Sequence, residues 1–378
     1  MSTDLALHIG ALRLVDHHVH SSLDHPVTRP EFEGHLTESD RPVPEGTTQF
    51  DSQIGFAVRR HCAPVLGLAP HATAEEYWQA RAARTPAELT RLFFEAAGTG
   101  HWIVDTGFAD GLLPLGDLAG TVPGEFSEVV RLESVLEDVA PASTAATLER
   151  DFRAALADAA ASAAGLKSIV AYRHGFDVEP ARPSAAEVTR AAGRWLATLS
   201  GGARPRVTDP VLLRMVLWAG VDTGLPLQLH AGFGDPDLDL RRSDPLLLAP
   251  WIRAVEPAGT RVALLHCYPF HRNAGFLAEA FPHVYFDVGL AVNHTGAASA
   301  AVIAESLELA PFSKILYSSD AWGPPELHHL GALLWRRGMT RALARWVGEG
   351  EWAERDAMRV ATMVGRTNAE RLYGLSDD

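Results

Sequence analysis

The chain has 378 residues, of which 47% are hydrophobic and 21% are charged, a composition typical of a globular protein with an ample core. Its 33 basic and 47 acidic residues give a net charge of −14, which argues against nucleic acid or an anionic membrane as a partner. Two cysteines cannot form a disulfide framework, and no apolar run is long enough to cross a membrane. Together these features predict a cytoplasmic protein without a membrane segment.

Short apolar runs alternate with helical segments along the chain. The runs are rich in valine, isoleucine and leucine, which suits strands that are buried on both faces. The predicted strands are 12–15, 102–104, 129–132, 166–172, 226–229, 262–265, 284–288 and 315–317, and the clearest helical segments are 143–164, 185–199, 211–223 and 297–309.

Eight strands alternating with helices predict an α/β fold, a distorted (β/α)8 TIM barrel that forms one domain over residues 1–378. A doubly wound open sheet is the competing architecture. It normally carries a glycine-rich phosphate loop after its first strand, whereas this chain has His17-His18-Val19-His20 there.

Two segments interrupt the alternation. Residues 21–72 form a long insertion after the first strand, which we expect to be a lid or pocket wall on the active face, or a surface excursion or oligomer contact. Residues 326–375 are expected to add extra C-terminal helices. Their dense arginines are expected to form a solvated basic face: Arg336, Arg337, Arg341 and Arg345.

Polar side chains follow several of the predicted strands at the point where each strand ends. His18 and His20 follow the first strand and point to one face, about 7 Å apart along an extended chain. His230 follows the fifth strand, His266 the sixth, and Asp320 the eighth. Because the chemistry of a barrel gathers at the C-terminal ends of its strands, we expect these five side chains to converge.

Several imidazoles with one carboxylate make a ligand set that suits Zn²⁺, with Mn²⁺, Fe²⁺ or Co²⁺ as alternatives. Such an ion lowers the pKa of a bound water towards about 7. Asp320 is then expected to contact the metal and to move the proton of that water. His266 is expected either to complete the ligand set or to polarise the substrate's carbonyl.

The pattern of these five residues on eight βα units resembles the amidohydrolase superfamily. Three longer stretches resemble its amidohydrolase-related (amidohydrolase 2) branch, in particular the nodulin-like domain that some organisms fuse to a glutamine-synthetase-like domain. These stretches are Leu166-Lys-Ser-Ile-Val-Ala-Tyr-Arg173, His230-Ala-Gly-Phe-Gly-Asp-Pro-Asp-Leu-Asp-Leu240 and His266-Cys-Tyr-Pro-Phe270.

The resemblance implies roles for individual residues. In the simplest members, the positions matching His18, His20, His230 and Asp320 hold one metal, and the position matching His266 is catalytic. Members with two metals add a carboxylated lysine or a glutamate at the end of strand four, and His266 becomes a ligand. Lys167 is the one lysine in the fourth strand, but the sequence places it near the start of that strand, so we favour one metal.

Further residues are candidates for contact with a substrate. Arg173 could hold a carboxylate bidentately, Glu133 closes the third strand, and Asp235 lies on the loop after His230 and could receive an amine. Trp322, directly after Asp320, is expected to form a pocket wall.

The sequence thus predicts a metal-dependent enzyme that hydrolyses a C–N (amide) bond of a small molecule. The resemblance makes a γ-glutamyl or amino-acid amide the natural substrate, and a homodimer the natural assembly. One alternative is a decarboxylase of a small carboxylic acid, since relatives in the same branch use the same ligands for that reaction. Another is a catalytically silent barrel with a binding or regulatory role.

Overall fold

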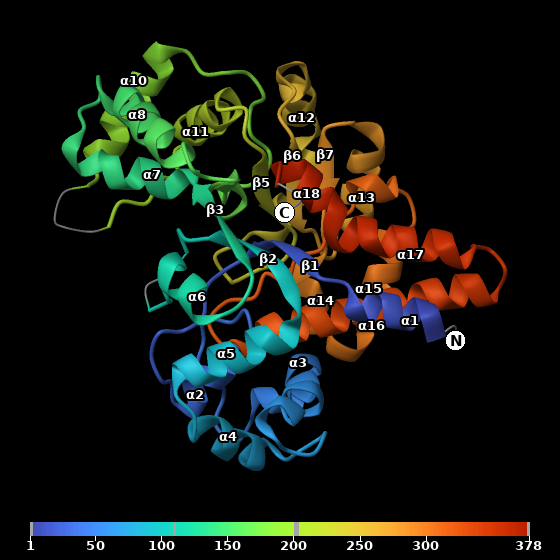
Figure 1. Cartoon of the computed structure of the whole chain (residues 1–378). Coiled ribbons are helices and arrows are strands. Elements are labelled where there is room, and N and C mark those ends of the chain that lie inside the picture. The colour runs from blue at the N-terminus through green and yellow to red at the C-terminus, as the bar shows by residue number, and fades with distance from the viewer. Residues whose placement is uncertain (1–2, 109–110, 200–203, 376–378) are drawn as a thin grey trace.

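The computed structural model describes residues 3–108, 111–199 and 204–375. Within these ranges seven strands form one parallel sheet in chain order, and helices surround it (Figure 1). This arrangement is TIM-barrel-like. The strands are β1 (Leu14–Val19), β2 (Thr99–Asp105), β3 (Glu125–Arg131), β4 (Gly165–Ser168), β5 (Leu227–Ala231), β6 (Val262–His266) and β7 (Val284–Phe286).

The predicted eighth strand is not a regular strand. Residues 315–320 do connect the two edges of the sheet, because the Leu316 amide donates to the Phe286 carbonyl (2.9 Å) and the His17 amide donates to the Tyr317 carbonyl (3.2 Å). The ladder is interrupted at Ser319, whose amide donates to the side chain of Asp16 (2.9 Å), and it resumes at Asp320, whose amide donates to the His18 carbonyl (3.2 Å). Side-chain capture of the backbone therefore replaces strand pairing at this position.

The fourth strand is shorter than the apolar run predicted. It ends at Ser168, and the rest of the run turns into the short helix α9 (Val170–Arg173). Ile169, with φ −109° and ψ 32°, marks the change from extended to helical backbone. Lys167 is consequently the penultimate residue of the strand, so the expectation that it lies near the start was wrong.

The helices pack around the sheet in groups. Figure 1 shows α7, α8, α10 and α11 together on one side, and α2 to α5 gathered on another. Their bounds are α1 (Thr3–Ala11), α2 (Arg29–Gly34), α3 (Gln53–Ala57), α4 (Ala74–Ala82), α5 (Pro86–Ala97), α6 (Leu115–Thr121), α7 (Leu132–Val139), α8 (Leu148–Ala160), α10 (Ala185–Leu196), α11 (Pro210–Asp222), α12 (Ala249–Val255), α13 (His271–Ala280), α14 (Gly289–Thr295), α15 (Ser299–Ser306), α16 (Glu326–Gly348), α17 (Glu354–Thr362) and α18 (Asn368–Tyr373).

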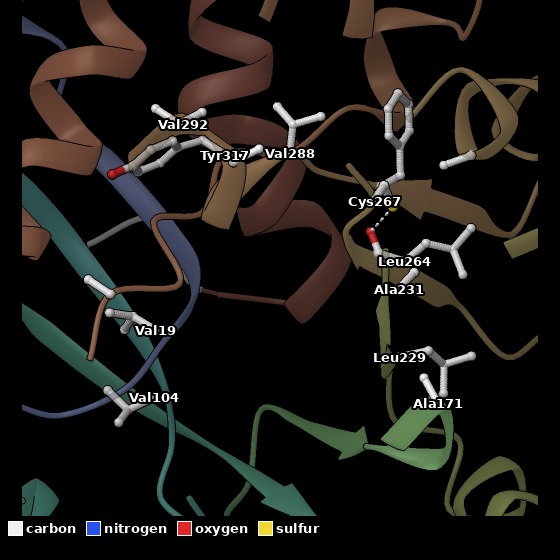
Figure 2. Packing of buried hydrophobic residues seen from close by; sticks show 14 of the residues in the cluster. Val19, Val104, Ala171, Leu229, Ala231, Leu264, Cys267, Val288, Val292 and Tyr317 are labelled. Atoms are coloured by element: carbon white, nitrogen blue, oxygen red, sulfur yellow. Dashed lines mark hydrogen bonds between the residues drawn. The ribbon is translucent and has the colours of Figure 1, made fainter. Parts of the chain in front are cut away.

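The core lies between the sheet and these helices. Figure 2 shows Val19 and Val104 from neighbouring strands, and Leu229 with Leu264 from β5 and β6, all of them buried. The thiol of Cys267 donates to the Leu264 carbonyl (3.3 Å) at the end of β6. Both cysteines are buried and free.

Residues 21–72 are more ordered than their composition predicted. They contain α2 and α3, and α2 begins with a reciprocal cap in which Thr28 and Glu31 bind each other's backbone amides. A π-helical turn, η2 (Val58–Cys62), continues α3. This insertion packs against α14 and α16.

One arginine of the expected basic face is not solvated. Arg336 on α16 is largely buried, and its guanidinium donates to the carbonyls of Leu12 (3.0 Å), Ala97 (2.6 Å) and Gly98 (3.0 Å). It therefore ties α16 to the chain before β1 and before β2.

None of the helices within the described ranges has the length and apolar character that a membrane span requires.

Candidate metal centre

Strand β1 delivers two imidazoles in a fixed orientation. The Nδ1 of His18 donates to Gln228 Oε1 (2.7 Å), and the Nδ1 of His20 donates to the backbone carbonyl of Asp105 (3.1 Å). These bonds set the tautomer, so both rings present the lone pair of Nε2. The ring centres are 5.2 Å apart. Two neighbouring imidazoles whose Nε2 atoms carry lone pairs are suitable ligands for one divalent ion.

Asp320 lies among the histidines. Its Oδ1 is 3.2 Å from His18 Nε2 and 3.6 Å from His20 Nε2, and its Oδ2 is 3.3 Å from His266 Nε2. Three possible ligand atoms lie within 4.8 Å of one another: one ring nitrogen of His18, one ring nitrogen of His266 and one carboxylate oxygen of Asp320. A second such group is formed by His18, His20 and Asp105. The spacing is that of groups able to share a metal.

His230 and His266 supply an independent test of whether a metal fits. The Nε2 atoms of both residues are buried and have no hydrogen-bond partner. Their ring centres are 4.8 Å apart. Because a buried polar atom without a partner costs about 1–3 kcal/mol, two such atoms beside a carboxylate call for an occupant. A divalent cation would satisfy them, so the residues present fit a metal ion.

Burial sets the protonation that metal ligands need. It lowers the pKa of His18 to about 3, with the cation of Lys167 adding to the effect, and it lowers the pKa of His230 and of His266 as well. Burial alone would raise the pKa of Asp320, but the surrounding histidines hold it well below its usual value. At neutral pH the site thus offers neutral imidazoles and an ionised carboxylate.

Lys167 belongs to the cluster. Its Nζ donates to His18 Nε2 (3.1 Å), and the side chain is almost completely buried. Burial lowers its pKa to about 8, against the opposing effect of Asp105 and Asp320. A lysine that is easily deprotonated, at the end of β4, meets the chemical requirement for carboxylation better than the sequence suggested.

Asp287 was missed by the sequence reasoning. It follows β7 directly, and its Oδ1 accepts from the backbone amide of His266 (3.0 Å) and from the hydroxyl of Ser318 (2.8 Å). Its Oδ2 lies 2.9 Å from His17 Nε2. Asp287 is also a polar residue that follows a strand, like the other predicted site residues. It was not recognised because the predicted strand extended through residue 288.

The backbone is strained where the ligands emerge. His266, Cys267 and Asp320 have φ values of 68°, 50° and 50°, in the left-handed region that non-glycine residues rarely occupy. Gly234 permits a close approach, since a Cβ there would collide with the Tyr172 hydroxyl and lie 3.2 Å from His230 Nε2. Rare conformations of this kind cluster at functional sites.

The cluster opens into a cavity of about 760 Å³. This volume is sufficient for a small molecule. Residues of the insertion form part of its wall, including His35 and Glu38. Trp322 packs against His35 (4.5 Å between ring centres) and Phe108 (5.0 Å). The predicted site residues that line the cavity are His20, Lys167, Arg173, His230, Asp235, Asp320 and Trp322.

Arg173 has the features of an anion-binding group. It is largely buried, its Nη2 lies 3.1 Å from a Glu137 carboxylate oxygen, and its Nε and Nη1 have no hydrogen-bond partner. Glu133, in contrast, is not part of the cavity wall. Its carboxylate accepts from the Ser168 hydroxyl (2.6 Å) and the Ile169 amide (3.1 Å), where β4 turns into α9. Its position therefore suits holding the end of β4.

The fold is the TIM-barrel-like fold of metal-dependent hydrolases of the amidohydrolase-related kind, and the cluster of histidines around Asp320 fits a divalent metal. The Amidohydrolase family model matches residues 70–375, and the chain belongs to this family.

Two relatives extend the comparison. Protein fluG from Emericella nidulans is 33% identical over 272 residues, which are 68% of this chain and 30% of fluG, so the chain spans less than a third of that relative's length. A protein from Lactobacillus casei described as a metal-dependent hydrolase superposes with a TM-score of 0.82 at 26% identity, covering 98% of this chain and 97% of the other.

A more distant structure shares only the fold. The uronate isomerase of Bacillus halodurans superposes with a TM-score of 0.68 at 13% identity, over 99% of this chain and 96% of the isomerase.

Proposed function

We propose that this protein hydrolyses a C–N bond, an amide, of a small molecule with the help of a divalent metal. The observation that carries the proposal is the pair of buried, unpartnered Nε2 atoms of His230 and His266 beside the carboxylate of Asp320, at the base of the cavity. We also propose that the barrel is a closed (β/α)8 barrel, in which residues 315–320 take the place of the eighth strand.

The metal would be held by His18, His20, His230 and Asp320. A second ion would recruit His266 and a carboxylated Lys167. Zn²⁺ suits this set best, with Mn²⁺, Fe²⁺ or Co²⁺ as alternatives. When bound, such an ion supplies Lewis acidity and lowers the pKa of water to near neutrality.

The chain's own residues move the proton. Asp320 is ionised and buried, so its carboxylate can accept a proton from the attacking water and return it to the leaving nitrogen. His266 is neutral, and its Nε2 is directed at the same carboxylate from 3.3 Å. It can polarise the substrate's carbonyl as the tetrahedral centre forms. Trp322, His35 and Phe108 exclude water from one side of the cavity.

Two cavity residues suit an amino-acid amide as the substrate. The free Nε and Nη1 of Arg173 can bind a carboxylate, and Asp235 can receive an ammonium group. A γ-glutamyl amide meets both requirements, and this choice rests further on the resemblance to the nodulin-like domain that some organisms fuse to a glutamine-synthetase-like domain. A homodimeric state and a cytoplasmic location stay predictions.

The test combines metal content with product release. Protein purified without chelator should hold about one metal per chain, and His230→Ala should lose it. A panel of γ-glutamyl and amino-acid amides should release ammonia or an amine with the wild-type protein only. Two metals per chain would place Lys167 and His266 among the ligands. No metal after reconstitution would overturn the proposal.

Arg173 also favours a second candidate, the decarboxylation of a small carboxylic acid. Its unpartnered nitrogens bind a carboxylate in either reaction. The products separate the two: carbon dioxide without ammonia would assign the lyase, whereas ammonia or an amine would assign the hydrolase.

A further inference from the structure

A second cavity, of about 390 Å³, lies apart from the metal centre. The insertion forms one wall through α3 and η2, α16 forms another, and the turn before α15 closes the third. The two cavities share no lining residue. Its titratable lining residues are four arginines and two histidines: Arg59, Arg60, Arg337, Arg341, His61 and His71. Among the described residues that line this arginine pocket, none is a carboxylate.

The arginines of the pocket are not neutralised by the protein. None of the four forms an ion pair with a described residue, in a chain whose net charge is −14. Arg59 donates through Nε to the Ala72 carbonyl (2.8 Å), and Arg337 donates through Nη1 to His61 Nε2 (3.2 Å). For Arg60 and Arg341 the described residues supply no hydrogen-bond acceptor. Unpaired cations in a concave site concentrate positive potential and attract anions.

His61 holds one of these guanidinium groups in place. Burial, with Arg337 and Arg60 nearby, lowers its pKa to about 4, so the ring is neutral at pH 7. Its Nε2 lone pair can then accept from Arg337, which leaves the remaining donors of that guanidinium for a ligand. The protein thus orients a cation without cancelling its charge.

The pocket also has an apolar part. Phe56 lines it and is 57% exposed, and Leu334 and Ala300 lie beside the charged groups. An exposed aromatic ring next to arginines is suited to stack against a planar organic group. Guanidinium groups match phosphate oxygens because they donate two parallel hydrogen bonds. A single carboxylate would leave most of the four cations unpaired, whereas a diphosphate would engage several.

We propose that the arginine pocket binds a phosphorylated small molecule of nucleotide size, with Arg60, Arg337 and Arg341 on its phosphate oxygens and its organic part against Phe56. The arginine run of α16, which the sequence assigned to a solvated face, would then be one wall of a binding site. The proposal does not depend on the reaction at the metal centre, because no residue is shared.

The test is calorimetric titration of the full chain with ADP and, separately, with inorganic phosphate, in a phosphate-free buffer of low ionic strength. ADP should bind with one site per chain and more tightly than phosphate. Arg341→Ala should weaken ADP binding about tenfold, and Arg60→Ala with Arg341→Ala should weaken it about a hundredfold, as expected for losing one and two charge-assisted contacts. Arg345→Ala is the matched control, since this exposed residue lies on the same helix outside the pocket.

Several outcomes would overturn the proposal. One is the absence of saturable ADP binding, and another is binding that the double variant leaves unchanged, which would place the nucleotide elsewhere, including the arginines of the metal cavity. ADP no tighter than phosphate would remove the role of Phe56. Sedimentation velocity tests the remaining alternative, that the pocket binds a second copy of the chain. A dimer that dissociates in the double variant, in a protein that does not bind ADP, would support that alternative and overturn the proposal.

Discussion

The metal centre and the arginine pocket both bring like groups together, but their surroundings differ. At the metal centre burial keeps the imidazoles of His18, His230 and His266 neutral, and the Nε2 atoms of His230 and His266 have no hydrogen-bond partner. In the arginine pocket Arg60 and Arg341 are exposed, so water can solvate charges that the protein does not pair. A buried cluster needs an occupant to satisfy it, whereas an open one is stable without its ligand.

Helix α16 contributes to both places. Near its start, His328 Nε2 donates to the backbone carbonyl of His20 (2.9 Å), which supports the end of β1. Further along, Arg337 and Arg341 enter the arginine pocket. The helix therefore has a buried end that positions a predicted ligand and a solvent-facing part with uncompensated charge. Substitutions at the metal centre and in the arginine pocket are therefore expected to have effects that differ in size and, for the free energy of unfolding, in sign.

The largest effect is expected for Asp320→Asn. The amide cannot accept the proton of water and neutralises the one carboxylate that contacts three histidines, so activity should fall about a thousandfold. Bound metal, measured by elemental analysis, should fall with it. Asp117→Asn, on the exposed face of α6, is the control and should keep both. Full activity in Asp320→Asn would show that the cluster is structural.

Gln228→Leu comes next and tests the orientation of a ligand. The substitution removes the acceptor of His18 Nδ1 and places an apolar side chain of similar size at that position in β5. Losing such a partner typically lowers metal affinity 10–100-fold, so zinc should transfer to a competing chelator at correspondingly lower concentration.

The readout for Gln228→Leu is affinity, which a change confined to the chemical step would not move. Gln79→Leu, on the exposed surface of α4, serves as the matched control. An unchanged affinity would mean that His18 keeps its ring orientation without Gln228, or that it is not a ligand.

Most of the centre was predictable because each of its residues follows an apolar run. His230 and His266 emerge at strand ends that β5 and β6 place side by side, and the sequence located both strands within one or two residues. The positions of Lys167 and Asp287 were not found, because an apolar run does not mark where extended backbone stops. Residues 169–173 continue the run in helical form, and residue 287 was included in a strand that ends before it.

The partners of the ligands could not be predicted in this way. Gln228 contacts His18, His17 and Tyr373, which lie more than 140 positions away in the chain. Such contacts depend on how the sheet curls, and no local pattern encodes that. The arginine pocket was not predicted for a similar reason, because it joins Arg60 of the insertion to Arg341 of the C-terminal helix.

A smaller effect, on stability alone, is expected for Arg336→Ala. This arginine adjoins the pocket residue Arg337 in sequence, but its guanidinium is paired with three backbone carbonyls. Leaving part of them without a donor should lower the free energy of unfolding by about 2 kcal/mol, measured by urea denaturation. Metal content should not change. A loss below about 0.5 kcal/mol would mean that water replaces the guanidinium.

The smallest effect is expected for Arg341→Ala, and its sign is the informative part. Arg341 is exposed and faces other cations, so its removal relieves repulsion and should raise the free energy of unfolding slightly, by up to about 0.5 kcal/mol at low ionic strength. The gain should disappear in about 1 M salt, where the screening length is about 3 Å.

Arg345→Ala provides the opposite sign. Its Nε lies 3.9 Å from a Glu349 carboxylate oxygen, so removing Arg345 forfeits a weak attraction and should lower stability slightly under the same conditions. The comparison requires urea titrations of both variants in matched buffers without phosphate. If Arg341→Ala instead destabilised the protein at low salt, Arg341 would have a favourable partner in the ligand-free chain, and the contrast between the two sites would narrow.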